Sequence, residues 1–396
     1  MTPKLHLAGL VRRLLLPLTL AAGLGLTGGA IAQDKEDIVI GGSIPMSGVF
    51  AFAGVGIHAG IGDYVKMLNE SGGIDGRMVR YVPEDTGYKV DVSVAAFKKI
   101  TSQNKVNLYY GDSTGFSKTI NPELDRMGTI MMTGASFATE INDPAKFPAQ
   151  FLVGPDYTEM FGILLRYIAK EKPGAKVAFV YSDTEFGRDP IKSSHAVAEQ
   201  LGLTVAAEIM TPPGSVDVST EVLKLRRANP DYTIFHGYVL APIPEFVSQG
   251  KQMGLKTRYM GTFWTMDNST IMQMGENADG FMGVMPFRYY YDEEGNSPMM
   301  KKIREMRPEY QSTAYMQGFL AAMLMTESVK RTLADGKDLT AANMKSSLQS
   351  IKDFDTGGII GVPVSVKGNS LPVGRIYRAD YSQKKMVPAS DWIILD

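Results

Sequence analysis

The sequence predicts an α/β protein of two similar lobes, each an α/β sandwich built on a parallel sheet. Apolar, β-branched runs such as Ile38-Val39-Ile40 alternate along the chain with amphipathic segments of helical spacing. That alternation is typical of parallel strands joined by covering helices. The same series starts again after Pro155, which indicates a second lobe. A chain of 396 residues is also long enough for two domains.

Residues 1–32 have the pattern of a secretory signal peptide. Lys4, Arg12 and Arg13 precede an apolar stretch from Leu14 to Leu26, and Ala30-Ile31-Ala32 has the small-residue spacing of a cleavage site. The apolar stretch is too short and too rich in glycine to span a bilayer as a stable helix; an uncleaved anchor is the alternative. We expect cleavage at the end of the Ala-Ile-Ala motif, after Ala32, and export to the periplasm.

Composition argues against several classes of protein. The chain has a formal net charge of −1, with both signs mixed along its length, and no basic stripe that would suit nucleic acid. It has no cysteine, so neither a lipoprotein anchor nor a disulfide framework is expected. Its histidines form no pair at helical spacing, so we expect no metal site. The glycines from Gly54 to Gly62 lack the spacing of a dinucleotide fingerprint, and no cofactor is expected.

The first strand–helix–strand unit of the chain runs from Ile38 to Val82. The strand Ile38–Ile40 leads into a glycine-rich loop, and a long helix ends at Ser71-Gly72-Gly73, before a new strand at Met78–Val82. Ligands of open α/β sheets bind beyond the carboxyl ends of the strands. We therefore expect the segment from Ser47 to Gly54, with Ser47 and Phe52, to face a functional cleft.

The rest of the chain continues the alternation in order. We expect further strands at Val106–Tyr110, Thr129–Met132, Phe151–Val153, Lys176–Tyr181, Thr204–Met210, Tyr232–Phe235, Tyr259–Gly261 and Gly280–Met285. Helices are expected at Val90–Gln103, Ser117–Met127, Tyr157–Lys170, Ile191–Leu201, Thr220–Ala228, Pro244–Met253, Ser297–Met306 and Ser312–Ala334. The tail reads as three short strands at Val362–Val366, Gly374–Ala379 and Trp392–Leu395.

Three motifs, taken together and in order, resemble one family. They are Pro45-Met46-Ser47-Gly48, Asn69-x-x-Gly72-Gly73-Ile74-x-Gly76 and Tyr259-Met260-Gly261. The chain resembles the periplasmic binding proteins of branched-chain amino acid ABC transporters over essentially its whole mature length. The resemblance implies a type I periplasmic-binding fold, with two lobes, three hinge crossovers and a ligand trapped by hinge closure.

The resemblance also implies how the chain divides and what it works with. Residues 33–155 with 284–366 are expected to form lobe 1, and residues 156–283 with 367–396 lobe 2. The expected partners are a small-molecule ligand and an inner-membrane ABC permease. The protein is expected to be a monomer and not an enzyme.

Two loops of lobe 1 are where the resembled family holds a ligand carboxylate with hydroxyls and backbone N–H groups. Here these loops are Ser113-Thr114-Gly115 and Ala135-Ser136-Phe137. Phe137 stands where a threonine is usual, so one hydroxyl donor is missing. Arg288, after an expected crossover strand, is a further candidate for pairing with a carboxylate.

In lobe 2 the resembled family places an acidic residue two positions beyond the glycine of Tyr-Met-Gly, where it pairs with the ligand's α-ammonium. Phe263, followed by Trp264, stands there in this sequence. An unpaired buried ammonium is costly, so an α-amino acid is disfavoured. Phe186 and Tyr238, at other expected pocket positions, would add rings to the cleft. We expect the ligand to be an aromatic or apolar carboxylate, and a branched-chain amino acid or an amide is the alternative. Any one of these aromatic residues could equally belong to the core of its lobe.

A serine hydrolase is the main competing function. Gly111-Asp112-Ser113-Thr114-Gly115 matches G-x-S-x-G between an expected strand and a helix, as in a nucleophile elbow. However, only His195 and His236 follow Ser113, and neither lies late in the chain as the histidine of an α/β-hydrolase does. In a binding protein, Ser113 and Thr114 would simply donate hydrogen bonds from their loop.

Overall fold

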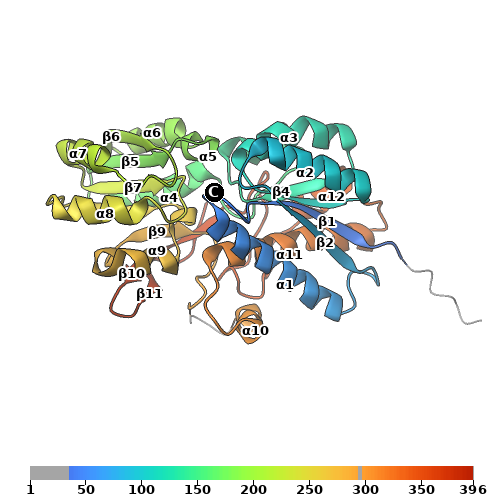
Figure 1. Ribbon diagram of the computed structural model, residues 1–396. Coiled ribbons are helices and arrows are strands. Elements are labelled where there is room, and N and C mark those ends of the chain that lie inside the picture. The colour runs from blue at the N-terminus through green and yellow to red at the C-terminus, as the bar shows by residue number, and fades with distance from the viewer. Residues whose placement is uncertain (1–34, 293–296, 396) are drawn as a thin grey trace, which may run out of the picture. The chain divides into compact units, whose positions relative to one another are not determined.

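The chain folds around two β-sheets, one in each of two lobes (Figure 1). The computed structural model describes residues 35–292 and 297–395, and the predicted signal peptide lies outside the described residues. The first sheet is parallel, with strand order β2-β1-β3-β4. Its strands are β1 (Ile38–Ile44), β2 (Val79–Asp85), β3 (Leu108–Gly111) and β4 (Met131–Gly134). Together with its helices, this sheet forms lobe 1.

Helices cover both faces of the lobe 1 sheet. Ile38 and Ile40 of β1 are buried in the core that contains the side chains of α1 and α11, whereas Val39 between them packs with α2 and α3. Burial on both faces is why these strands are continuously apolar. The helices are α1 (Ala51–Glu70), α2 (Val90–Gln103), α3 (Thr114–Met127), α11 (Thr313–Ala334) and α12 (Ala341–Gln349).

Helices α1 and α11 lie side by side although they are far apart in the sequence (Figure 1). A Cβ atom on Gly60 would lie 2.2 Å from the carbonyl oxygen of Tyr315, and one on Gly318 would lie 2.5 Å from that of Ile57. The two backbones therefore touch where both helices lack a side chain. This close packing accounts for Gly56 and Gly60 of α1, whereas Gly54 faces the Pro45 carbonyl and a Cβ atom on Gly62 would meet nothing within 4 Å.

The second sheet forms lobe 2 and has the order β11-β10-β9-β8-β7-β5-β6, with β12 paired to β10. Neighbours from β5 to β9 are parallel, and β10 is antiparallel to β9, β11 and β12. The strands are β5 (Lys176–Ser182), β6 (Thr204–Thr211), β7 (Tyr232–His236), β8 (Arg258–Gly261), β9 (Met282–Met285), β10 (Val373–Asp380), β11 (Lys385–Pro388) and β12 (Ile393–Ile394).

The lobe 2 helices lie on two faces of the sheet. Val177 and Phe179 of β5 pack in the core that includes α4, whereas Ala178 and Val180 pack in the core that includes α7 and α8. The helices are α4 (Tyr157–Glu171), α5 (Glu185–Arg188), α6 (Ile191–Gln200), α7 (Ser219–Ala228), α8 (Ile243–Gln252) and α9 (Asn268–Met274). A 3₁₀ turn, η2 (Phe263–Thr265), follows β8, and α10 (Pro298–Met306) follows the segment after β9.

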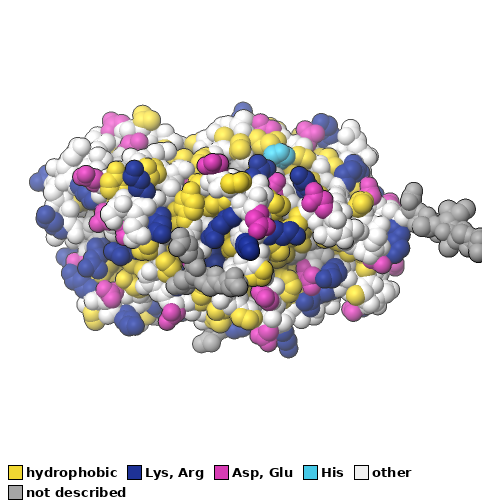
Figure 2. Space-filling view, turned by 90° about the horizontal axis from the view of Figure 1, so that it is seen from below, with side chains coloured by type: hydrophobic (Ala, Val, Ile, Leu, Met, Phe, Trp, Pro, Cys, Tyr) yellow, Lys and Arg dark blue, Asp and Glu magenta, His cyan; other side chains and the backbone are white. Residues whose placement is uncertain are grey.

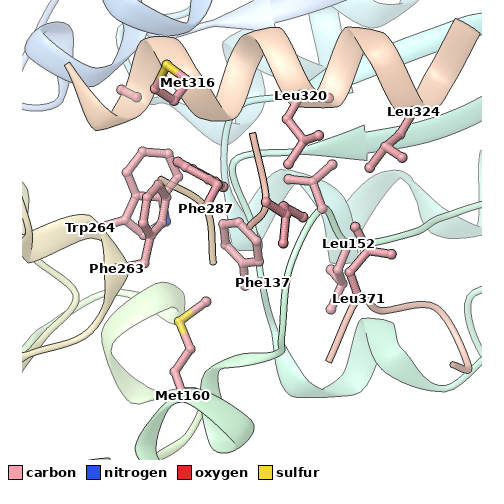
Figure 3. Packing of buried hydrophobic residues seen from close by; sticks show 14 of the residues in the cluster. Phe137, Leu152, Met160, Phe263, Trp264, Phe287, Met316, Leu320, Leu324 and Leu371 are labelled. Atoms are coloured by element: carbon pink, nitrogen blue, oxygen red, sulfur yellow. The ribbon is translucent and has the colours of Figure 1, made fainter. Parts of the chain in front are cut away.

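The chain passes between the two sheets three times: after β4, after β9 and before β10. Figure 3 shows the apolar packing around these passages. The ring of Phe137, after β4, lies 5.6 Å from that of Phe263, which in turn lies 5.0 Å from Phe287, after β9. Leu371, before β10, belongs to the same core cluster. The crossovers are therefore packed together rather than left as separate loops.

Two predicted strands are wrong, and several short elements were not predicted. Residues 151–153 form no strand, because the Leu152 N–H donates to the Asn369 carbonyl 2.7 Å away and only one bridge, at Gln150, joins this segment to β4. Residues 362–366 likewise form a single bridge, between Phe354 and Val364. The sequence does not predict α5, a helix of four residues, or α12 and β11, which carry few apolar residues in a clear period.

On the face that Figure 2 shows, acidic and basic side chains are interspersed. No helix in the described parts of the chain is long and apolar enough to cross a membrane.

Candidate functional site

A cavity lies between the lobes, at the carboxyl ends of their strands. It is lined from lobe 1 by Pro45, Phe50, Ala53, Ile57, Tyr88, Asp112, Ser113, Thr114 and Ala135, and from lobe 2 by Tyr157, Phe186, Val239 and Trp264. Segments that follow β1, β2, β3 and β4, and β5, β7 and β8, supply most of these residues, as expected for an α/β sheet. The cavity volume is about 30 Å³. Typical ligand pockets hold about 300–1,000 Å³, so a larger ligand must separate the side chains that now fill the space.

Asp112 is the one charged residue among those that line this cavity. Its side chain is buried, and its carboxylate accepts hydrogen bonds from Ser93 Oγ at 2.6 Å, from Ser113 Oγ at 2.8 Å and from Thr86 Oγ1. Burial raises the pKa of Asp112, and the three hydroxyl donors offset part of that rise. Among the described residues, no basic side chain forms an ion pair with it.

The loop after β3 presents hydroxyls and the start of α3. Ser113 caps α3: its Oγ accepts the Phe116 N–H at 3.2 Å and donates to Asp112. Thr114 Oγ1 and Ser136 Oγ share a hydrogen bond of 2.8 Å, and Ser136 Oγ also accepts the Ala138 N–H at 3.1 Å. When Ser136 donates the shared hydrogen, the Thr114 hydroxyl, which lines the cavity, keeps its own hydrogen for a ligand.

Aromatic rings form the apolar walls. On the lobe 1 side, Phe50 and Tyr88 have ring centroids 4.2 Å apart; on the lobe 2 side, Tyr157 and Phe186 are 5.0 Å apart. Trp264 joins the two sides, because its Nε1–H donates to the Ala135 carbonyl at 3.2 Å. The indole therefore presents its ring, and no free donor, to the cavity.

Two bulky residues at the cavity have backbones that side chains rarely adopt. Tyr88 has a φ of +63°, and Leu240, next to the lining residue Val239, has a φ of +70°. Such conformations are uncommon and cost about 1–3 kcal/mol each. The Tyr88 turn is held by the Gly87 N–H, which donates to Asp85 Oδ1 at 3.1 Å. Strain of this kind tends to gather where function requires one particular side-chain placement.

Comparison with known proteins identifies the family. The family model described as "periplasmic binding protein" matches residues 37–381. The chain belongs to the periplasmic binding protein family. This confirms the resemblance predicted from the sequence, and the family consists of binding proteins rather than enzymes.

Individual relatives agree with that assignment. The Leu/Ile/Val/Thr-binding protein of Salmonella typhimurium is 23% identical over 294 residues, covering 74% of this chain and 79% of the relative. The Leu/Ile/Val-binding protein of Escherichia coli is 22% identical over 280 residues, covering 71% and 75%.

Solved structures show the same fold. The branched-chain amino acid ABC transporter protein of Thermus thermophilus with bound valine matches with a TM-score of 0.82 and 23% identity, covering 91% of this chain and 97% of that one. The fatty acid ABC transporter substrate-binding protein of Thermomonospora curvata has a TM-score of 0.79 and 17% identity, covering 91% and 93%. The predicted type I periplasmic-binding fold is confirmed.

In this periplasmic binding protein, five of the predicted ligand-binding residues line the cavity, namely Ser113, Thr114, Ala135, Phe186 and Trp264. Ser136 lies one hydrogen bond behind Thr114.

The other predicted ligand-binding residues lie elsewhere. Phe137 and Phe263 are fully buried against each other, and the Tyr238 hydroxyl shares a 2.7 Å hydrogen bond with Thr211 in the lobe 2 core. Ser47 is exposed, Phe52 is half-buried in α1, and Gly115 is the second residue of α3. Their part in ligand binding stays a prediction. Arg288 also lies away from the cavity and donates to the Gly358 carbonyl at 2.9 Å.

The sequence analysis did not single out several residues that line the cavity. These are Pro45, Ile57, Tyr88, Asp112, Tyr157 and Val239. Two more lining residues, Phe50 and Ala53, lie within the segment from Ser47 to Gly54 that was expected to face a cleft. In the sequence, Asp112 stands out as part of the G-x-S-x-G motif, and its place directly after an apolar strand is the signal that marks it as a cavity residue.

The geometry around Ser113 does not suit a hydrolase. Its hydroxyl is engaged with Asp112 and Phe116, and its hydrogen-bond partners in the described chain include no histidine. His236 is bonded instead to Thr262 and to the Phe186 carbonyl. Among the described residues, no group of His, Cys, Asp and Glu could hold a metal ion.

Proposed function

We propose that this protein is the solute-binding component of an ABC importer, and that it presents a small, largely apolar ligand to an inner-membrane permease. Membership of the periplasmic binding protein family supports this role. The names of the relatives, which include amino acid and fatty acid binding proteins of ABC transporters, support it as well. A signal peptide cleaved after Ala32 would place the mature protein in the periplasm, where it would act as a monomer.

The ligand we propose is an aromatic or apolar carboxylate. The observation that carries this is the composition of the lobe 2 side, where Tyr157, Phe186, Val239 and Trp264 line the cavity and none is acidic. The α-ammonium of an amino acid would have no carboxylate partner on this side, and burying an unpaired charge is costly. Rings, in contrast, suit an apolar ligand body.

The polar end of such a ligand fits lobe 1. Thr114 is the first residue of α3, whose first N–H groups have no partner within the helix and whose N-terminal end favours negative charge. The spare hydroxyl hydrogen of the Thr114–Ser136 pair adds a donor. Asp112 is nearby, but its carboxylate accepts hydrogen bonds from three hydroxyls, which disperse its charge and limit its repulsion of a ligand carboxylate.

One observation favours a second candidate, an α-amino acid. Asp112 lines the cavity from lobe 1, and an ionised Asp112 would be a partner for a ligand ammonium. Several relatives are named for binding leucine, isoleucine and valine. In this case lobe 1 would hold the ammonium, whereas the family resemblance implies an ammonium partner in lobe 2.

A thermal-shift screen with an Asp112→Asn variant separates the two candidates. The refolded mature protein is tested against benzoates, cinnamates, aliphatic acids and branched-chain amino acids. Ligand at 100 times its dissociation constant stabilises by about 2.7 kcal/mol. We expect apolar acids to stabilise both the wild type and Asp112→Asn, with exposed Asp91→Asn as the matched control. Stabilisation by amino acids that Asp112→Asn abolishes would establish the second candidate, and no shift anywhere in the panel would contradict both.

A further inference from the structure

A fully buried histidine lies directly behind the lobe 2 side of the cavity. We call the four residues that line this side, Tyr157, Phe186, Val239 and Trp264, the ring wall. His236 is the last residue of β7, has no exposed surface, and is not itself among the lining residues.

The hydrogen bonds of His236 define its tautomer. Its Nε2 lies 3.0 Å from the Phe186 carbonyl oxygen, and a carbonyl can only accept, so Nε2 carries the hydrogen. Burial lowers the pKa of His236 to about 3, so the ring is neutral and Nδ1 is an acceptor. The Thr262 hydroxyl, 2.8 Å from Nδ1, is therefore the donor. Each hydrogen bond of the imidazole has a fixed direction.

The imidazole also packs edge-to-face with aromatic rings on several sides. Its centroid lies 4.7 Å from the ring of Tyr157, 4.9 Å from that of Phe186 and 5.5 Å from that of Phe161, at angles between 69° and 79°. Edge-to-face contacts at these distances are favourable and restrict ring orientation. Two of these three rings belong to the ring wall.

Two residues of the ring wall, Tyr157 and Phe186, contact this side chain directly. Trp264 is connected to it through the backbone, because Thr262, which donates to the imidazole, immediately precedes η2 and its carbonyl accepts the Thr265 N–H at 3.0 Å. Val239 lies three residues after His236 in the loop that follows β7. Neither the hydrogen-bond partners of the imidazole, Thr262 and the Phe186 carbonyl, nor its three ring neighbours carry a charge. We propose that His236 is the positioning residue of the ring wall: through Thr262 and the Phe186 carbonyl it holds the aromatic surface that receives the ligand.

The proposed function supplies the reason for such a wall, but the positioning role is testable without any ligand. Trp264 and Trp392 are the two tryptophans, so a Trp392→Phe background makes Trp264 the sole fluorescent reporter. Quenching by acrylamide then measures how tightly the buried indole is held, and urea unfolding measures global stability.

The informative variants change one hydrogen bond at a time. Thr262→Val removes the hydroxyl that donates to Nδ1 and keeps the shape of the side chain nearly constant. Thr262→Ser keeps that hydroxyl. His236→Phe keeps a ring but loses both hydrogen bonds. Thr233→Val is the matched control, because Thr233 is also fully buried on β7 and shares a 2.9 Å hydrogen bond with Thr257.

We expect Thr262→Val and His236→Phe to raise the quenching constant of Trp264 at least twofold, and Thr262→Ser and Thr233→Val to leave it unchanged. If Thr262→Val lowers stability as Thr233→Val does and leaves quenching unchanged, His236 is an ordinary core residue and the proposal is wrong. Should His236→Phe fail to fold, the Thr262 pair still decides. Failure of benzoate to bind the wild type would contradict the proposed ligand class, not the positioning role, which the quenching alone decides.

Discussion

The two sides of the cavity differ in the polarity of the side chains that line them. On the lobe 1 side, a buried carboxylate, Asp112, is surrounded by the hydroxyls of Thr86, Ser93 and Ser113. On the lobe 2 side, four uncharged residues line the cavity, and two of them, Tyr157 and Phe186, pack against His236. The imidazole nitrogens of His236 bond to Thr262 and to the Phe186 carbonyl. Both sides carry aromatic rings, but only the lobe 1 side adds a carboxyl group and hydroxyls to them.

This difference indicates how the two lobes would divide the work of recognition. Lobe 1 offers hydrogen-bond donors and the N-terminus of a helix, which would bind the polar end of a ligand through directed hydrogen bonds and favourable electrostatics. Lobe 2 offers a surface that reads shape and apolar area. Trp264, on the lobe 2 side, donates a hydrogen bond to the Ala135 carbonyl on the lobe 1 side, and this bond connects the two sides of the cavity.

The largest expected effect concerns the stability of the lobe 2 side and its dependence on pH. His236 has a pKa of about 3 in the folded protein and about 6.5 when unfolded. Between these values the unfolded chain binds the extra proton, so this residue's contribution to the free energy of unfolding falls by about 1.4 kcal/mol per unit as pH is lowered. Above about pH 6.5 that contribution is constant.

Urea unfolding of the wild type and of His236→Phe between pH 7 and pH 4 isolates this contribution, because carboxylates such as Asp112 titrate in both proteins. We expect the difference between the two curves to shrink steadily below pH 6.5. A difference that stays flat would mean that His236 is not buried in its neutral form. Nuclear magnetic resonance titration of the wild-type imidazole is the check if His236→Phe does not fold.

The next effect tests the ring wall itself. Trp264→Ala removes a buried ring of the cavity and its link to Ala135, and we expect ligand binding to weaken by about 2–4 kcal/mol. Trp392→Ala is the control, since that ring lies outside the cavity lining. Calorimetric titration measures both. An unchanged dissociation constant together with a lower melting temperature would assign Trp264 to the core.

The smallest effect tests the lobe 1 side. Thr114→Val removes one hydroxyl of the Thr114–Ser136 pair, and we expect binding of an apolar acid to weaken by about 1 kcal/mol, roughly fivefold. Thr114→Ser should restore it. Equal binding by all three proteins would show that the ligand's polar end is held elsewhere.

Sequence reasoning located part of each side of the cavity, Ser113, Thr114 and Ala135 in lobe 1 and Phe186 and Trp264 in lobe 2. The G-D-S-T-G loop could be recognised because its residues are consecutive and follow an apolar strand, and Ser113 and Thr114 do line the cavity. In contrast, Phe263 and Trp264 are adjacent, yet Trp264 lines the cavity and Phe263 packs against Phe137. Which of the two faces inward depends on the η2 turn, which no local pattern reveals.

The surroundings of Asp112 and His236 were equally hidden. Thr86 and Ser93, which bond to Asp112, lie 26 and 19 residues from it in the sequence, and Phe186 lies 50 residues before His236. Contacts of this range follow from strand order, not from spacing. The fold class could be predicted because alternating apolar runs repeat along the whole chain, whereas α12 and β11 have too little apolar periodicity to be seen.

The most direct test of the central claim uses ligands that differ only by an ammonium group. Ligand-free protein is titrated calorimetrically with 4-methylpentanoate and leucine, and with 3-phenylpropanoate and phenylalanine. Because the ring wall offers an ammonium no acidic partner, we expect at least one acid to bind and its amino acid to bind at least about 100-fold more weakly, or about 2.7 kcal/mol. If leucine or phenylalanine binds more tightly than its acid, Asp112 pairs with the ammonium and the proposed ligand class is wrong.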